Sequence, residues 1–254
     1  MLTIRQIPVL TDNYIYLIHD QLSEKTAVVD PALVDPVLSE LSNSGWSLDY
    51  ILNTHHHADH VGGNLGLKSE TGCTIVGSRS DAKRIPGIDI ELGEGDIFEL
   101  GESVAKVLAV SGHTIGHIAY WFGVDDALFC GDTLFALGCG RLFEGSAEQM
   151  WKSLGKLKTL PGATRVYCAH EYTQANGRFA LTVDPKNILL AERMERVNQL
   201  RQDGAPTVPS TLADEFLTNP FLRADTPELR ATSELPDASP QTVFAEIRRR
   251  KDRF

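Results

Sequence analysis

The segment Thr54-His55-His56-His57-Ala58-Asp59-His60 places four imidazoles and a carboxylate within seven residues. It directly follows the apolar run 50–52, which has the composition of a short buried strand. A strand carries the chain to the edge of a sheet, and the loop beyond it can turn several side chains toward one point. The H-x-H-x-D-H spacing therefore predicts a metal site, because clusters of histidine and aspartate usually indicate one.

Three distant residues repeat the pattern of a strand followed by a metal-binding side chain. They are His113 after the run 104–110, Asp132 after 127–129 and His170 after 166–168. Potential ligands at four strand ends indicate one shared edge, where rigid elements can hold a site. A single histidine at such a position would more often be structural, but beside the first cluster these residues become candidate ligands. His56 lies between two ligands, and we expect it to point away.

The number of donors decides between one metal ion and two. The donors are His55, His57, Asp59, His60, His113, Asp132 and His170. A single zinc ion takes about four ligands, whereas two ions about 3.5–4 Å apart account for all seven. Asp132 is the expected bridge, because Asp59 is committed beside His60. Imidazole and carboxylate donors suit zinc, iron or manganese and do not choose among them.

The order of apolar runs predicts an α/β domain over residues 1–170 and a helical domain over 171–254. The expected strands are 2–7, 14–18, 27–29, 50–52, 74–76, 104–110, 118–122, 127–129 and 166–168. No convincing strand follows residue 170. With 254 residues, of which 42% are hydrophobic, the chain can bury a substantial core.

Capping signals locate the helices. Asp35-Pro36 followed by Gly45, and the capping-box spacing from Ser146 to Gln149, each predict a helix in the first domain. Asp184-Pro185 is expected to open a long helix that Gly204 closes. Shorter helices are expected after Thr211, Thr226 and Ser239.

Charge and composition narrow the partners and the location. A net charge of −10 argues against a general nucleic-acid surface, which needs a basic face. No apolar run approaches the roughly 20 residues of a membrane span. The four cysteines lack C-x-x-C spacing, which favours buried reduced thiols. Since we also recognise no secretion signal, we expect a cytoplasmic monomer that binds neither membranes nor nucleic acid.

The metal motifs resemble the metallo-β-lactamase superfamily, and further segments are similar to its hydroxyacylglutathione hydrolase (glyoxalase II) family. These segments are Gly131-Asp-Thr-Leu-Phe135, Gly138-Cys-Gly-Arg141, Ala169-His-Glu-Tyr-Thr173, Asn219-Pro-Phe221 and Arg248-Arg-Arg-Lys-Asp252. The resemblance spans essentially the whole chain. It implies a four-layer αββα sandwich with a C-terminal α-helical domain. It also implies hydrolysis of S-D-lactoylglutathione to D-lactate and glutathione, which ends methylglyoxal detoxification.

The resemblance also implies roles for individual residues. His55, His57 and His113 would hold one metal ion, and Asp59, His60 and His170 the other, with Asp132 bridging. The glutathione contacts would be Arg141, Tyr172, Arg248 and Lys251. Phe143 departs from the pattern, because some members carry a tyrosine there whose hydroxyl binds the substrate.

The helical spacing of the C-terminal basic residues supports part of this assignment. If Ser239 caps the last helix, Phe244, Ile247, Arg248 and Lys251 share one face. Arg249 and Arg250 point elsewhere. Taken alone, such cations would be expected only to complement the helix dipole; the resemblance assigns Arg248 and Lys251 to substrate.

The expected mechanism is metal-assisted thioester hydrolysis. Two cations lower the pKa of a bridging water from about 15.7 toward neutrality, which makes hydroxide available. Asp59 is expected to orient that hydroxide. The rivals are a mononuclear iron persulfide dioxygenase, a secreted β-lactamase, a nuclease of the same superfamily and a metal-loaded scaffold without activity. The helical C-terminal domain disfavours the dioxygenase, and the lack of a recognisable signal peptide disfavours the β-lactamase. The acidic net charge disfavours the nuclease, and the complete set of seven donors disfavours the scaffold.

Overall fold

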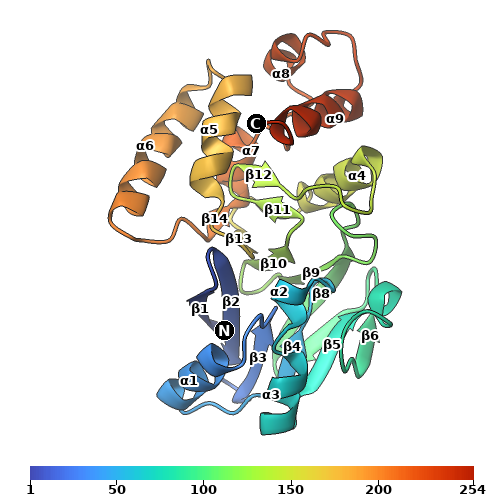
Figure 1. Ribbon diagram of the computed structural model, residues 1–254, viewed down its shortest axis with the longest axis vertical. Coiled ribbons are helices and arrows are strands. Elements are labelled where there is room, and N and C mark those ends of the chain that lie inside the picture. The colour runs from blue at the N-terminus through green and yellow to red at the C-terminus, as the bar shows by residue number, and fades with distance from the viewer. The chain divides into compact units, whose positions relative to one another are not determined.

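Strand β2 (Asn13–Asp20) is buried along its whole length, as expected for an interior strand. It pairs antiparallel with β1 (Leu2–Val9) and with β3 (Lys25–Val29). The parallel strands that follow are β4 (Tyr50–Leu52), β5 (Thr74–Ser78) and β6 (Ile90–Leu92). The computed structural model describes residues 1–254 and shows this sheet in the order β1-β2-β3-β4-β5-β6 (Figure 1).

A second set of strands packs against this sheet. These antiparallel strands are β7 (Ile97–Leu100), β8 (Ser103–Ala109), β9 (Ile118–Phe122) and β10 (Ala127–Gly131). Tyr16 on β2 meets Phe129 on β10, with ring centroids 5.6 Å apart. The hydroxyl of Tyr120 on β9 donates a 3.0 Å hydrogen bond to the carbonyl of Asn53. The core between the sheets therefore reaches the start of the histidine segment.

Two helices cover the outer face of the first sheet (Figure 1). Val37 of α1 (Asp35–Ser44) and Leu67 of α3 (Asn64–Thr71) join Ile51 of β4 in one apolar cluster. Both helices lie in connections between neighbouring parallel strands, which require such a crossover. Short helical turns, α2 (Ala58–Val61) and η1 (Arg79–Asp81), complete this part of the chain.

The chain forms two compact units. The first comprises residues 1–109 and 116–131, and the second comprises residues 110–115 and 132–254. The second unit contains strands β11 (Leu134–Phe135), β12 (Gly138–Cys139), β13 (Arg165–Cys168) and β14 (Ser210–Thr211), and helices α4 (Ala147–Leu157), α5 (Thr173–Val183), α6 (Ile188–Gln202), α7 (Leu212–Thr218), α8 (Pro227–Thr232) and α9 (Pro240–Lys251). Apolar residues hold α5 and α6 together as a helical hairpin (Figure 1). The boundary expected at residue 170 stays a prediction. No helix is both long and apolar enough to cross a membrane.

Most of the expected helix signals are confirmed. Ser146 and Gln149 form a reciprocal capping box at the start of α4. Thr211, Thr226 and Ser239 each accept a hydrogen bond from the amide three residues later. Gly45 ends α1 with a φ of 70°, a conformation that favours glycine. Local chemistry therefore sets these helix ends.

The long helix expected before Gly204 is present as α6, but its predicted start at Asp184-Pro185 was wrong. Helix α6 begins at Ile188 with Asn187 as its N-cap, whereas Asp184 ends the preceding helix α5. Asp184 accepts a 2.9 Å hydrogen bond from the Asn187 side chain, which holds the turn between the helices. Helix α5 itself was missed, because its interior Asn176-Gly177 has the composition of a turn. A Cβ on Gly177 would lie 1.9 Å from Met194 Sδ, so glycine permits the close approach of α6.

Two smaller expectations also need correction. Asp35 was expected to cap α1, but it is the first helical residue and Val34 occupies the cap position. A short strand, β14, exists beyond residue 170 and pairs antiparallel with β13. Its two residues are too few to give a recognisable alternation of apolar and polar side chains.

Replacing the capping residue of α4 tests its contribution to stability. Ser146→Ala leaves the Gln149 amide without its side-chain acceptor, so the protein should lose about 0.5–2 kcal/mol of stability. For a chain of this size, that loss corresponds to a fall in Tm of roughly 1–8 °C. Calorimetry measures the change. Ser42→Ala, at an exposed position inside α1, is the matched control and should leave Tm nearly unchanged. Equal Tm values for the two variants would contradict the capping role.

Candidate functional site

The histidine segment is fixed by hydrogen bonds at the end of β4. The Thr54 amide donates to Asp30 Oδ1 at 2.8 Å, and its hydroxyl donates to Asp30 Oδ2 at 2.7 Å. The Thr54 carbonyl accepts from the Ile118 amide at 2.9 Å. These bonds fix the backbone at Thr54, from which the loop leads into α2.

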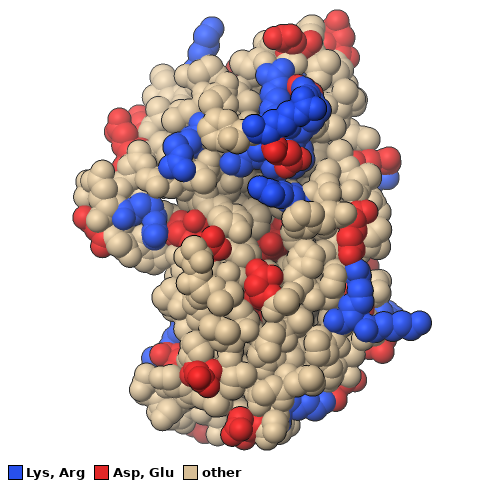
Figure 2. Space-filling model, in the orientation of Figure 1, with Lys and Arg blue, Asp and Glu red and all other residues tan.

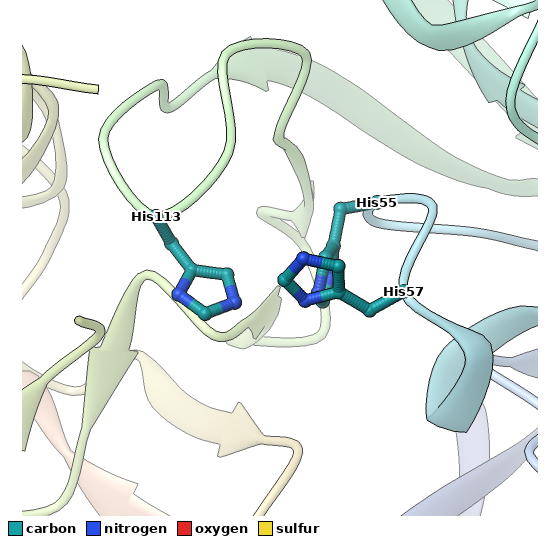
Figure 3. Close-up of side chains that lie close together, drawn as sticks. All are labelled: His55, His57 and His113. Carbon is teal, nitrogen blue, oxygen red and sulfur yellow. The ribbon is translucent and has the colours of Figure 1, made fainter. Parts of the chain in front are cut away.

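His55 and His57 present nitrogen atoms to each other. Nε2 of His55 lies 3.0 Å from Nδ1 of His57, and Figure 3 shows these two rings. His55 is buried and His57 is partly buried. Two nitrogen ligands of one tetrahedral zinc ion lie about 3.3 Å apart. The observed spacing therefore suits a shared metal ion.

His60 and Asp59 form a second pair of donors in the same unit. Nε2 of His60 lies 3.6 Å from Oδ2 of Asp59. The other ring nitrogen, Nδ1, lies 3.0 Å from Asp30 Oδ2, and this contact fixes the ring with Nε2 facing Asp59. Asn13 donates a 3.0 Å hydrogen bond to the same oxygen of Asp59. Both donors are thus oriented by residues from other strands.

His56 turns toward a different partner. Its Nδ1 lies 3.1 Å from Oδ2 of Asp81, which is fully buried and also pairs with Arg84. A buried carboxylate with two cationic or polar partners is a structural ion pair. His56 therefore has a place in the fold that does not require metal.

The second unit brings together His113, Asp132 and His170. Nε2 of His113 lies 3.4 Å from Oδ2 of Asp132, and Nε2 of His170 lies 3.3 Å from Oδ1. The two carboxylate oxygens therefore face different imidazoles, which is the arrangement that a bridging ligand needs. Nδ1 of His113 lies 2.8 Å from the Arg141 carbonyl, so Nε2 is the nitrogen available to a metal ion.

Sequence reasoning missed residues that support these donors. Asp30 directly follows β3, so the strand-end pattern could have identified it, whereas His117 precedes β9 and falls outside that pattern. The ring of His117 is buried and stacks on that of His55, with centroids 4.6 Å apart and planes inclined by 16°. Asn13 gave no signal, because an asparagine at the start of a strand is common in turns.

A cavity of about 400 Å³ in the second unit joins possible metal donors to cationic side chains. His113 and Asp132 line one part of it, and Arg141, Arg248 and Lys251 line another. Lys and Arg side chains gather over the surface that α5, β12 and α9 occupy (Figure 2). The cavity can therefore accept an anionic molecule whose reacting group lies near Asp132.

Arg248 and Lys251 lie on the packed face of α9, as expected from the helical spacing. Arg248 is 4% exposed and donates from Nη1 to the Cys139 carbonyl at 2.8 Å. Its Nη2 donates to Oδ1 of Asp252, also at 2.8 Å. Arg249 is exposed and pairs with Glu246. The expected difference between the two faces is confirmed.

Lys251 has an environment that disfavours its charge. Burial, followed by the positive charges of Arg248, Arg141 and Arg178, lowers its pKa from 10.5 to about 8. The nearby Asp252 acts in the opposite direction. Nζ also lies between the rings of Phe179 and Phe254, 5.4 and 5.3 Å from their centroids. A bound carboxylate would relieve the repulsion among these cations.

Aromatic residues line the part of the cavity near the donors. Tyr172 stacks on His170 with ring centroids 4.7 Å apart and planes inclined by 3°. Phe143 lies 5.2 Å from the His113 ring and is exposed at the cavity. A phenyl ring there supplies apolar surface and no hydroxyl donor.

The buried cysteines are thiols rather than disulfides. Burial raises the pKa of Cys139 to about 11 and that of Cys168 to about 12. Thiols with such pKa values carry almost no thiolate at neutral pH, so they are poor soft ligands for a metal ion.

Comparison with known proteins identifies both parts of the chain. Residues 10–170 match the Metallo-beta-lactamase superfamily, and residues 171–254 match the Hydroxyacylglutathione hydrolase C-terminus. The hydroxyacylglutathione hydrolase of Methylococcus capsulatus is 63% identical over 254 residues, covering 100% of this chain and 99% of the relative.

Solved structures have the same fold. The crystal structure of ETHE1 from Myxococcus xanthus has a TM-score of 0.69 at 26% identity and covers 98% of each chain. A crystal structure of TTHA1623 in a di-iron-bound form has a TM-score of 0.63 at 24% identity and covers 87% of this chain and 100% of that one. The expected metallo-β-lactamase fold, an αββα sandwich with a helical C-terminal region, is confirmed.

The pKa of Lys251 can be measured directly. In ¹³C-methylated protein, NMR should show Lys251 losing its charge near pH 8, because burial and neighbouring arginines favour the neutral amine. Lys25, whose pKa is raised by Asp49, is the control and should titrate at higher pH. Arg248→Ala should move the Lys251 titration upward. Titration of Lys251 together with Lys25 would contradict the assigned environment.

Proposed function

Because the chain belongs to the hydroxyacylglutathione hydrolase family of the metallo-β-lactamase superfamily, we propose that it hydrolyses S-D-lactoylglutathione and related 2-hydroxyacylglutathiones. The products would be D-lactate and glutathione, as in the final step of methylglyoxal detoxification. One observation carries the proposal. The same cavity is lined by His113 and Asp132 and by the cations Arg141, Arg248 and Lys251, which suits a thioester with distant carboxylates.

The donor set fits two divalent metal ions. We propose that His55, His57 and His113 hold one ion, that Asp59, His60 and His170 hold the other, and that Asp132 bridges them. Within each unit the donor atoms already lie at distances that a shared ion would require. Zinc, iron and manganese all accept these imidazole and carboxylate ligands, and of the three we propose zinc.

When bound, such ions lower the pKa of water to near neutrality and polarise a carbonyl group. The protein's part is to hold the donors in position. The two oxygens of Asp132 face His113 and His170, so this carboxylate would hold both ions. The side chain of Asn13 orients Asp59, which we propose would direct the attacking water. In the reaction a water oxygen bonds to the carbonyl carbon and the carbon–sulfur bond breaks. Glutathione leaves as a thiolate, so little help from a general acid is required.

The cationic side of the cavity would select glutathione. Its carboxylates can accept hydrogen bonds from the guanidinium groups of Arg141 and Arg248 and from the Lys251 ammonium. The Tyr172 hydroxyl can offer a further donor, whereas Phe143 has none. These contacts lie away from the reacting carbonyl, so they contribute equally to substrate and transition-state binding.

The alternatives predict different behaviour. A scaffold protein would tolerate the loss of a donor, and a mononuclear oxygenase would need one ion. The match of residues 171–254 to the C-terminus of hydroxyacylglutathione hydrolase supports the thioesterase over both. A cytoplasmic location and a monomeric state stay predictions, and the four free, buried thiols support the first of them.

Metal content tests the dinuclear proposal. Purified protein should carry close to two transition-metal ions per chain, measured by elemental analysis.

Asp132→Asn should weaken metal binding and lower kcat by orders of magnitude, because the bridge is lost. His56→Ala and His19→Ala should keep nearly normal metal content, since the partners of these rings are Asp81 and Thr26. Full activity with one ion per chain would refute two-metal catalysis, and metal loss in His56→Ala would overturn the ligand assignment.

Substitutions on α9 test glutathione recognition. Arg248→Ala and Lys251→Ala should each raise KM for lactoylglutathione and leave kcat mostly intact. Loss of a charge-assisted hydrogen bond costs about 1.5–3 kcal/mol, or roughly tenfold to a hundredfold in kcat/KM.

Arg249→Ala is the matched control, because this side chain is exposed and pairs with Glu246, so its steady-state constants should hardly change. A small thioester without glutathione's carboxylates should be a poor substrate that is insensitive to all three substitutions. Unchanged KM values in both Arg248→Ala and Lys251→Ala would place glutathione recognition elsewhere.

A further inference from the structure

The hairpin of β11 and β12 has a strained turn. Leu137, between the two strands, has a φ of 59°, which a branched side chain rarely adopts. Such a conformation persists only where the surrounding structure holds it. Leu137 is fully buried, so its backbone groups cannot form hydrogen bonds with water and need partners in the protein.

Side chains from two helices bind the backbone of this turn. Oε2 of Glu215, on α7, accepts a 2.9 Å hydrogen bond from the Leu137 amide. Nδ2 of Asn219 lies 3.1 Å from the Phe135 carbonyl and 3.0 Å from the Gly138 carbonyl. Asn176 of α5 donates to the Ala136 carbonyl at 3.1 Å. Each residue of the turn thus has a backbone hydrogen bond to a helix side chain.

Glu215 is itself held by buried partners. It is 0% exposed, and Oε1 pairs with Nη2 of Arg193, which is 6% exposed. Arg193 Nη1 also donates to the Thr218 hydroxyl at 2.6 Å. A buried charge pair is stable only when its remaining donors and acceptors are satisfied. The pair therefore holds the Glu215 carboxylate in one position beneath the hairpin.

The hairpin lies between residues of the cavity. Asp132 precedes it and Arg141 follows it, and the Gly140 amide donates to the Thr133 carbonyl at 3.2 Å. A Cβ on Gly140 would lie 2.0 Å from the Asp132 carbonyl oxygen, so these backbones are in close contact. Other cavity residues contact backbone carbonyls within the hairpin and directly after it. The Cys139 carbonyl accepts from Arg248, and the Arg141 carbonyl lies 2.8 Å from His113 Nδ1.

We infer that Glu215 and Asn219 are positioning residues that set the places of both Asp132 and Arg248 through the hairpin. Neither residue lines the cavity, so each acts through the backbone it binds. The inference rests on the proposed function, which gives Asp132 its role toward metal and Arg248 its role toward glutathione. It predicts that one substitution outside the cavity affects metal binding and substrate binding together.

Two substitutions test this inference. Asn219→Ala removes the donors to the Phe135 and Gly138 carbonyls and to Glu215 Oε2, but it leaves the ion pair between Glu215 Oε1 and Arg193 in place. Glu215→Gln keeps the shape of the side chain but replaces one acceptor oxygen with an NH2 group. That NH2 group then faces another donor, either Arg193 or the Leu137 amide. Each variant should bind zinc 10- to 100-fold more weakly, as estimated for the loss of outer-shell partners, and should show a raised KM for lactoylglutathione. Zinc affinity is measured by competition with a chelator, and stability by Tm.

Asp184→Asn is the matched control for general loss of stability. Asp184 is 3% exposed and pairs with Arg223 and Asn187, away from the hairpin. Its substitution should lower Tm without changing zinc affinity or KM. Wild-type zinc affinity and KM in Asn219→Ala would overturn the inference, as would equal losses in Asp184→Asn at a similar Tm.

The two proposals fail in different ways. If Glu215→Gln does not fold, Asn219→Ala decides the question, because its buried charge pair remains. If the wild-type protein binds zinc but does not hydrolyse lactoylglutathione, the proposed function fails. The comparison of zinc affinities would still decide whether Asn219 and Glu215 position Asp132.

Discussion

The carboxylate of Asp30 accepts hydrogen bonds from the amide and hydroxyl of Thr54 and lies 3.0 Å from Nδ1 of His60. It is 3% exposed, so these contacts replace the water that a carboxylate would otherwise bind. The contacts connect the end of β3, the loop after β4 and helix α2. Since removing any partner would leave part of a buried charge unsatisfied, the three segments share one arrangement. The histidine segment depends on that arrangement.

The same physical solution recurs for other donors. Nδ1 of His113 lies against a backbone carbonyl, and Asp59 is held by the amide of Asn13. Each of these two donors is thus held in one orientation by a contact with protein. Such outer contacts reduce the orientational freedom that a ligand would lose on binding metal. In the second unit, Glu215 and Asn219 extend this principle from side chains to a segment of backbone.

Charge is distributed unevenly over this acidic chain. Its net charge is −10, yet Arg141, Arg248 and Lys251 line one cavity. Burial of Lys251, together with the positive charges of the neighbouring arginines, lowers its pKa to about 8. A dianionic ligand would offset these positive charges.

Local sequence determined the features that depend on neighbouring residues. The sequence predicted which residues cap four helices and which face of α9 is buried. The structure confirms that face and the caps at Ser146, Thr211, Thr226 and Ser239. Resemblance to known motifs added the fold, which comparison confirms. The ligand assignment stays a prediction. These features were accessible because capping and helical periodicity act over a few residues.

Only the tertiary structure decided which distant residues support the site. Glu215 is an ordinary acidic residue in the sequence, and for Asp30 the sequence shows only that it follows a strand. Their roles arise from contacts with Leu137 and Thr54, far along the chain. Helix α5 was missed because Asn176-Gly177 favours a turn locally, whereas packing against Met194 and the bond to Ala136 favour the helix. Local propensity amounts to about 1 kcal/mol per residue, so burial and long-range hydrogen bonds can outweigh it.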